Sequence, residues 1–397
     1  MSKGLLQTTI GSGTFVAPGA NERVTLLNEG VPGSVIEMGV AKSFEECNNM
    51  ITPMIRKVAE HPYPEQFITY NDPSGMAHQR QAGQQWVSKF DVDTNVDNLF
   101  ILTGAQNAIM ITLLTLFEPG DRIAVDSFAF SNFMELSRLQ RISLVPIKGD
   151  AAGMLPSELE AACKRHRIKG IFQVPSCANP TTIMMSQKRR EDLAAVIQRN
   201  DLMLIEDDAD AFMTYGYTKK DLHSFHSMIP ESTIYICGTS KSICSGIRVA
   251  YLVTPERFVG KFKHTIFNAN VKTSSLEGEI VTQAILSGTA DKIVQRKIEI
   301  SKKANAMFDK IFDSYYSPDK RHTHPFPYFR WIPIKGVESP QAVAAHLYAR
   351  GVNVFPSNLF LSDKNIKDKY LRVSLCSAGS FEAFEKGLGI IAKVIIM

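Results

Sequence analysis

Residues 99–126 read LFILTGAQNAIMITLLTLFEPGDRIAVD. The stretch opens with an apolar run over 99–102, continues with a helical pattern over 104–116, and closes with a second apolar run over 122–126. Short apolar runs on both sides of a helix-length segment are typical of a strand-helix-strand unit in a parallel sheet whose two faces are covered. The stretch therefore predicts an α/β fold.

The same alternation continues to residue 253 and then gives way to a different order. Further strands are expected at 143–147, 170–174, 202–206, 233–237 and 248–253, with helices at 156–166 and 187–200. Beyond about residue 287 we expect a long helix at 290–315, a strand at 328–332, a helix at 340–350, strands near 352 and 371, and a last helix from 381.

These patterns predict two domains. A large domain over 61–287 is expected to hold a mostly parallel mixed sheet covered by helices, followed by a smaller α+β domain over 288–397. Residues 1–60 are expected to form an N-terminal arm and a segment that packs on the small domain, since the first 23 residues show no periodicity.

The composition favours a soluble cytoplasmic enzyme. The 397 residues are 44% apolar and 21% charged with a net charge of +4, and the basic residues are scattered, so neither nucleic-acid nor membrane binding is supported. Six cysteines without a CxxC pair predict reduced thiols. No apolar segment reaches the ~18 residues of a membrane span, and the N-terminus lacks a signal-peptide core.

Two loops that follow predicted strands suit a phosphate and a reactive carbonyl group. Residues 103–106 (TGAQ) open a helix, where backbone N–H groups bind phosphate. Residues 238–241 (GTSK) offer the Lys241 amine among small residues, where partial burial would lower its pKa and make it a nucleophile. Arg248 adds a planar fork for a phosphate. Open parallel sheets bind ligands at this strand edge.

Two further groups occupy the same predicted edge. Asn179 precedes Pro180, which holds it out of the helical region and can aim its amide across the edge. Glu206, Asp207 and Asp208 close an apolar strand, and three adjoining carboxylates need a cationic partner such as a protonated ring nitrogen. Together the four groups suit a phosphorylated, ring-shaped, electron-accepting cofactor.

Each group also has an ordinary structural explanation when it is taken alone. A packing turn, an Asn-Pro turn, helix-capping acids and a surface lysine would account for them. The pairs His223/His226 and His322/His324 could bind a metal, but they stand in polar loops without a nearby acid set. We therefore expect these histidines to be solvated and predict no metal site.

The order and spacing of these groups resemble the fold type I pyridoxal-phosphate enzymes, specifically the class I/II aminotransferases with an aspartate aminotransferase-like fold. The likeness is greatest to the 2-aminoadipate-type enzymes and to the aminotransferase-like half of MocR-type regulators. It extends to Tyr70-x-x-x-x-Gly75 with Arg80, to residues 371–374 (LRVS), and to Asp126 with Phe130.

The resemblance implies the cofactor pyridoxal 5′-phosphate and a set of residues that bind it. These are Gly104, Ala105, Gln106, Phe130, Asn179, Asp207, Asp210, Ser240, Lys241, Arg248 and Tyr70. It implies two catalytic residues: Lys241, which forms the internal aldimine and shuttles a proton, and Asp207, which pairs with the pyridinium nitrogen.

Further roles follow from the same resemblance. Arg372 is implied to clamp the substrate α-carboxylate, with Asn179 beside it, while Phe130 stacks on the cofactor ring. Ala105, Gln106, Ser240 and Arg248 are implied to hold the phosphate. Tyr70 is implied to reach the phosphate of the partner subunit, which predicts a homodimer with shared active sites.

Three positions depart from the family pattern. Asp210 stands where the family has an aromatic hydroxyl; an ionised carboxylate cannot donate a hydrogen bond, so Asp210 either points away or is protonated. Gly238 stands where a phosphate-binding hydroxyl is usual. The family's paired glycines are replaced by Phe326-Pro327, followed by residues 328–331 (YFRW), and this bulk and cation predict a restricted substrate pocket.

The resemblance implies an aminotransferase that acts on an α-amino acid and a 2-oxo acid through the Lys241 aldimine. Two alternatives remain open: a pyridoxal-phosphate-dependent lyase or cyclase of specialised amino-acid metabolism, and a non-enzymatic MocR-like ligand sensor. The sensor is the weaker alternative, because it needs a winged-helix domain for which the first residues are too few and not basic enough.

Overall fold

A computed structural model describes residues 6–9, 13–16, 31–218, 221–316 and 322–396. Its centre is a seven-stranded sheet in the order β4-β12-β11-β10-β9-β5-β6. The strands span β4 Leu99–Leu102, β5 Arg122–Asp126, β6 Ser143–Ile147, β9 Ile168–Gln173, β10 Met203–Asp207, β11 Thr233–Gly238 and β12 Ala250–Val253. Only β12 runs antiparallel to its neighbours, so the predicted mostly parallel mixed sheet is confirmed.

Helices cover both faces of this sheet. Successive side chains of a strand point to opposite faces, so each strand contributes to two apolar clusters. In β4, Phe100 and Leu102 join one apolar cluster with α3 and α10, whereas Leu99 and Ile101 join another with α2 and α11. The helices of this region are α2 Ala77–Ser88, α3 Gly104–Leu116, α4 Ser131–Leu139, α5 Pro156–Arg165, α6 Gln187–Arg199, α7 Ala211–Thr214, α8 Phe225–Met228, α9 Thr239–Ser242, α10 Val259–Asn270 and α11 Ser275–Leu286.

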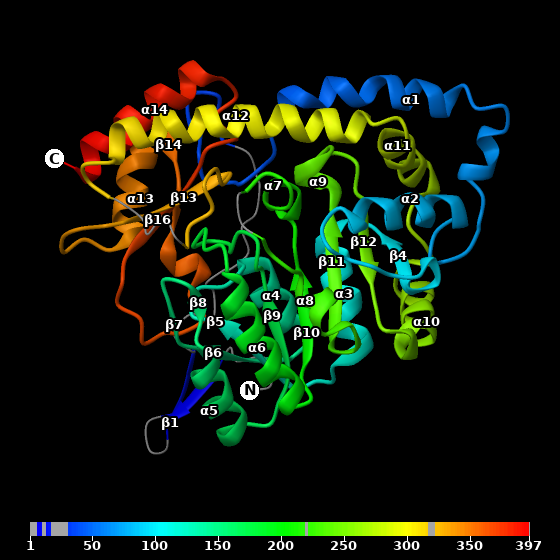
Figure 1. Ribbon diagram of the computed structural model, residues 1–397. Coiled ribbons are helices and arrows are strands. Elements are labelled where there is room, and N and C mark those ends of the chain that lie inside the picture. Colours follow the sequence, from blue (N-terminus) through cyan, green and yellow to red (C-terminus); the bar gives the residue numbers. More distant parts are fainter. Residues whose placement is uncertain (1–5, 10–12, 17–30, 219–220, 317–321, 397) are drawn as a thin grey trace.

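A long helix, α12 (Thr289–Phe312), runs along one side of the molecule beside α1 (Thr52–Ala59) and α14 (Phe381–Ile395) (Figure 1). A three-stranded sheet in the C-terminal region has the order β13-β16-β15 and packs against α13, while α14 contacts α12, α13 and β14. The elements here are β13 Phe329–Pro333, α13 Pro340–Ala349, β14 Val352–Asn353, β15 Phe355–Pro356 and β16 Tyr370–Ser374.

The N-terminal part of the described chain packs against this C-terminal region. The short strand β3 (Ile36–Glu37) pairs with β14, and Met38 accepts a hydrogen bond from the backbone of Ser374. The remaining elements are β1 Leu6–Thr9 paired with β2 Gly13–Val16, β7 Gly149–Asp150 paired with β8 Gly153–Met154, and the 3-10 turns Glu45–Ile51, Pro64–Phe67, Val96–Asn98, Pro230–Ser232, Glu256–Phe258 and Ser357–Phe360. Much of the expected N-terminal arm, residues 1–5, 10–12 and 17–30, lies outside the described residues.

The six cysteines are free thiols, as their spacing predicts. Within the described ranges, no helix is both long enough and apolar enough to cross a membrane.

Candidate active site

A cavity of about 420 Å³ lies where β9, β10 and β11 end and the following loops begin. This is the strand edge at which the sequence predicts ligand binding. The structure brings together most of the predicted site residues in its wall: Ala105, Gln106, Phe130, Asn179, Asp207, Asp210, Ser240, Lys241, Arg248 and Arg372.

Lys241 and Asp210 face each other across this cavity. Lys241 lies in the single-turn helix α9, and its Nζ donates to Asp210 Oδ2 at 3.0 Å. The Asp210 side chain is only 2% exposed, and its Oδ1 has no hydrogen-bond partner among the described residues. The carboxyl group of Asp210 therefore points into the cavity and contacts the Lys241 amine, a partner that the sequence does not predict.

The charges around Lys241 shift its pKa in the direction opposite to the prediction. Burial lowers the pKa of Lys241, but the ion pair with Asp210 outweighs burial and leaves the pKa above its usual value. Burial raises the pKa of Asp207 to about 7, although the Lys241 charge opposes this. Asp207 Oδ1 has no partner in the described chain, so this buried carboxyl group lacks the cation that its charged form requires.

A cradle for an anion lies at the start of α3. Gly104 has a φ of +79°, and a Cβ at this position would lie 2.6 Å from Arg248 Nη2, so only glycine allows the arginine to cross here. Arg248 donates to Ser240 Oγ at 2.6 Å. Where a family member usually has a hydroxyl stands Gly238, whose Cβ would lie 3.2 Å from Ala105 Cβ, so a side chain here would press closely on the start of α3.

A second anion site surrounds Arg372 in β16. Its Nη1 donates to Asn179 Oδ1 and its Nη2 to the Gly39 carbonyl, both at 2.8 Å. Arg372 as a residue is 2% exposed, and its guanidinium carbon lies 4.6–5.5 Å from the rings of Phe329, Phe355 and Phe360. Burial lowers its pKa to about 9. No carboxylate of the described residues forms an ion pair with this buried cation, which favours an acidic ligand.

Tyr70 is the predicted site residue that the structure does not bring to the cavity. Its side chain is 87% exposed, in a segment that also exposes Tyr63 and Ile68. It does not line the cavity of its own chain, and its predicted role requires a partner subunit.

The stretch 326–331 lies beside the cavity, and its restriction of the substrate pocket stays a prediction. None of its described side chains lines the cavity wall. Arg330 turns toward α12 and pairs with Asp309 at 2.8 Å, and Tyr328 and Trp331 are buried in packing. The Phe329 ring lies 5.7 Å from Lys241 Nζ. Alternation along β13 sends successive bulky side chains to opposite sides of the strand.

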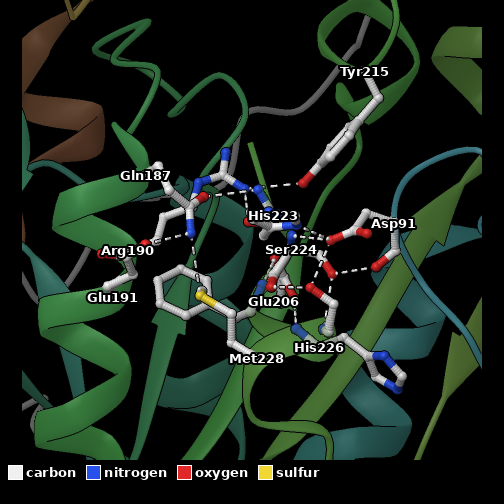
Figure 2. Close-up of polar contacts among 12 residues, drawn as sticks. Asp91, Gln187, Arg190, Glu191, Glu206, Tyr215, His223, Ser224, His226 and Met228 are labelled. Atoms are coloured by element: carbon white, nitrogen blue, oxygen red, sulfur yellow. Dashed lines mark hydrogen bonds and ion pairs between the residues drawn. The ribbon is translucent and has the colours of Figure 1, made fainter. Parts of the chain in front are cut away.

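Glu206, inside β10, belongs to a buried network of polar contacts that is separate from the cavity wall (Figure 2). Glu206 accepts the backbone N–H groups of Phe225 and His226, each at 3.0 Å, at the start of α8. Arg190 is fully buried, and it donates to the Tyr215 hydroxyl at 3.0 Å. Burial raises the pKa of Glu206 to about 8 and that of Asp208 to about 6, against the attraction of Arg190. The contacts of Glu206 and Arg190 support the end of the strand, and neither side chain lines the cavity.

The prediction that the histidines of the pairs 223/226 and 322/324 are solvated is wrong for one member of each pair. His226 and His324 are buried, not solvated, and burial lowers the pKa of His226 to about 4. Among the described residues, no group of three or more histidines, cysteines and acids could hold a metal ion.

Two parts of the site are missing from the sequence interpretation. The loop 40–43, together with Asn132 and Phe355, lines the cavity. Lys297, on α12, donates a hydrogen bond to the backbone carbonyl of Lys241, a residue of the cavity wall. A signal for Lys297 exists in the sequence, since it occupies the buried helical face between Ile293 and Ser301, where an apolar residue would be expected.

The profile of the family described as aminotransferase class I and II matches residues 44–391. The chain belongs to this family. It is 30% identical to an uncharacterized HTH-type transcriptional regulator, YdeF, of Bacillus subtilis, and the match covers 99% of this chain and 83% of that protein. It is 22% identical to 2-aminoadipate transaminase of Thermus thermophilus, over 65% of this chain and 64% of that enzyme.

Solved structures agree on the fold of this aminotransferase. A crystal structure of an archaeal alanine:glyoxylate aminotransferase superposes with a TM-score of 0.84 at 20% identity, over 93% of this chain and 92% of that one. The α-aminoadipate aminotransferase LysN of Thermus thermophilus, complexed with N-(5′-phosphopyridoxyl)-L-leucine, gives 0.81 at 18% identity over 92% of each chain. Both establish an aspartate aminotransferase-like α/β fold.

The family is one of pyridoxal-phosphate-dependent transferases, and pyridoxal 5′-phosphate is the cofactor of this aminotransferase. The cavity fits it on three counts. Asp207 has a buried oxygen without a partner, which suits a protonated ring nitrogen. The Gly104 turn and Arg248 form an anion cradle that a Cβ would fill. Lys241 Nζ faces the same cavity between them.

The first prediction concerns the support that Lys297 gives to this aminotransferase. Its fully buried Nζ donates to Ser43 Oγ at 2.6 Å and to the carbonyl groups of Lys241 and Ile243 at 2.9 and 3.0 Å. Lys297→Met removes the donor to Ser43 Oγ and to the Ile243 carbonyl, and it leaves the Lys241 carbonyl with only the Ser43 hydroxyl. We expect the free energy of unfolding to fall by about 2–3 kcal/mol, measured by urea unfolding at pH 7.

This effect should depend on pH with a defined sign. Burial lowers the pKa of Lys297 from 10.5 to about 8, so the unfolded chain binds the proton more tightly than the folded chain. Stability of the wild type relative to Lys297→Met should therefore rise from pH 8 towards 10.5. The exposed lysine Lys188 provides a control, and equal stability of Lys297→Met and Lys188→Met would contradict the assignment.

Proposed function

We propose that this protein is an aminotransferase that moves the amino group of an α-amino acid to a 2-oxo acid. The observation that carries the proposal is the combination in one cavity of a lysine amine, a buried carboxyl group without a partner, and an arginine without an acid. These are the groups that a cofactor aldehyde, a ring nitrogen and a substrate α-carboxylate require.

The cofactor is proposed to lie between Phe130 and the sheet edge. Lys241 would hold its aldehyde carbon through Nζ, and Asp207 would pair with its ring nitrogen. The Asn179 side-chain oxygen already accepts from Arg372, which leaves its NH₂ group to donate to the phenolic oxygen. Arg248, Ser240 and the first backbone N–H groups of α3 would hold the phosphate.

When bound, pyridoxal phosphate supplies an electron-accepting ring that stabilises a carbanion at the substrate α-carbon. Arg372 would orient the substrate by a two-point hydrogen bond to its α-carboxylate, which selects the bond that breaks. Lys241 Nζ would then remove the proton from the α-carbon and hold it for return. Asn179 would keep Arg372 in place during this transfer.

A homodimer is part of the proposal. Its support is the exposed segment that carries Tyr63, Ile68 and Tyr70, because three large side chains at 67–87% exposure favour a covering surface. In a dimer, Tyr70 would complete the phosphate cradle of the partner subunit.

A ligand sensor with the same cofactor is a second candidate, favoured by the 30% identity to a protein named as an HTH-type transcriptional regulator. A sensor would bind an amino acid in the same cavity without turnover. A lyase or cyclase would differ in another way, since it needs no 2-oxo acid to complete its cycle.

The second prediction tests these functions directly. The protein loaded with pyridoxal phosphate is mixed with single amino acids in the absence of any 2-oxo acid, and both the visible spectrum and the products are recorded. We expect stoichiometric conversion of the cofactor to its pyridoxamine form, with one oxo acid released per site. Many product molecules per site would indicate a lyase or cyclase, and a spectral change without product would indicate a sensor.

A further inference from the structure

We propose that Asp210 is a catalytic carboxylate that holds a proton on Lys241 Nζ and accepts that proton when the amine reacts. The inference deepens the proposed function and rests on it, because it concerns the amine that would bind the cofactor. It also concerns a residue at which this chain departs from the family, whose aromatic hydroxyl would donate a hydrogen bond and carry no charge.

The contact has the geometry of a proton-transfer pair. Asp210 stands directly before α7, three residues beyond Asp207, and its Oδ2 lies 3.0 Å from Lys241 Nζ. A general base must lie about 2.6–3.2 Å from the proton-bearing atom. The side chains are 2% and 18% exposed, so little water competes for the proton.

The carboxyl group depends on this one cation. Among residues that the structure describes, only Lys241 lies within ion-pair distance of Asp210, and Oδ1 has no partner. Two more carboxyl groups, Asp207 and Asp208, lie nearby at the end of β10. These negative charges stabilise the protonated form of the Lys241 amine, which therefore keeps its proton until the amine reacts.

The remaining titratable groups do not replace this pair. Cys177 faces it from the loop after β9, and Tyr328 and Cys376 face it from the small domain. Burial raises the pKa of each of these three groups, so they stay neutral near pH 7. Arg330 is a further cation near Cys177, and its Nη2 donates to Asp309.

The proposed step moves one proton and creates no net charge. An N–H bond of the Lys241 ammonium breaks, and an O–H bond forms at Asp210 Oδ2. The electron pair of the broken bond stays on Nζ, which becomes a neutral amine able to attack a carbonyl carbon. Both groups end neutral, and burial favours neutral forms. Asp210 can later return the proton to Nζ.

The substitution Asp210→Asn separates this role from simple positioning. Asparagine keeps a side-chain oxygen that can accept from Nζ, but it can neither balance the ammonium charge nor take its proton. We expect Lys241 to lose its proton about 1–3 pH units lower in Asp210→Asn, the effect of removing an opposite charge at this distance. Asp210→Tyr should also lower the pH at which Lys241 loses its proton. Asp210→Glu keeps the negative charge, so this pH should stay close to that of the wild type.

The measurement is trace acetylation of the full-length chain, freed of cofactor, with acetic anhydride across a pH series. Mass spectrometry of the Lys241 peptide, scaled to the exposed Lys188, gives the pH at which the amine becomes reactive. This readout needs neither cofactor nor turnover. Asp208→Asn serves as the matched control, because Asp208 belongs to the same cluster but has no described bond to Nζ.

An unchanged midpoint in both Asp210→Asn and Asp210→Tyr would overturn the inference. So would an equal shift in Asp208→Asn, which would assign the effect to the whole cluster. Failure of the proposed function has a separate signature: a wild-type chain that acquires no visible absorption band with pyridoxal phosphate. The acetylation result decides the role of Asp210 in either case.

Discussion

Lys241→Ala is expected to abolish the visible absorption band that the wild-type protein acquires with pyridoxal phosphate, and to abolish its activity. The band requires an amine within reach of the cofactor aldehyde, and Lys241 Nζ is the amine that faces Asp210 inside the cavity. Loss of proton transfer alone should reduce turnover by about 10²–10⁴-fold. The measurement is a visible spectrum of each protein after loading and gel filtration.

Lys42→Ala is the matched control for this result. Lys42 also lines the cavity but stands on the loop that precedes α1, so its removal should leave the absorption band in place. An unchanged band in Lys241→Ala, or a lost band in Lys42→Ala, would show that the covalent site is assigned to the wrong lysine.

Arg372→Ala is expected to weaken amino-acid binding by about 30-fold to 4,000-fold while leaving cofactor binding intact. Removing one partner of a buried, hydrogen-bonded charge pair costs about 2–5 kcal/mol, and each 1.4 kcal/mol is a factor of ten. Arg372 as a residue is 2% exposed and its guanidinium pairs with no described carboxylate, so the substrate α-carboxylate would supply its counter-charge. Titration of the cofactor spectrum with an amino acid measures the dissociation constant.

Two other variants make this result specific. Arg372→Lys keeps the charge but loses the planar fork, so its affinity should fall between those of the wild type and the alanine variant. Arg248→Ala should show the opposite pattern, with loss of cofactor affinity, because Arg248 belongs to the Gly104 cradle. Loss of cofactor in Arg372→Ala at unchanged thermal stability would show that Arg372 holds the cofactor instead.

The strands and helices of the chain were largely predictable, because apolar periodicity is a local property. Helix α3 begins and ends as its sequence predicts, and β4, β5 and β6 match their apolar runs. Helix α2 is absent from the prediction, since its sequence AHQRQAGQQWVS has little apolar contrast between faces. It packs against β4 and against α11, and α11 is almost 190 residues further along the chain.

The candidate site was predictable to the extent that it follows strand ends. Parallel strands align their carboxyl ends at one edge, so residues after β9, β10 and β11 had to lie near one another. Asn179, Asp207 and Lys241 follow this rule, and all three line the cavity. Their roles in binding and catalysis remain predictions until the variants above are measured.

The sequence by itself determined the α/β fold, the family and the strand edge that holds the cavity, because short patterns of apolar residues and a few spaced motifs encode them. Only the tertiary structure decided that Asp210 faces Lys241, that Lys297 supports the Lys241 backbone from α12, and that Arg330 turns to Asp309. These contacts join residues 21–56 positions apart. Whether such side chains meet depends on how separate elements pack, and no local periodicity carries that information.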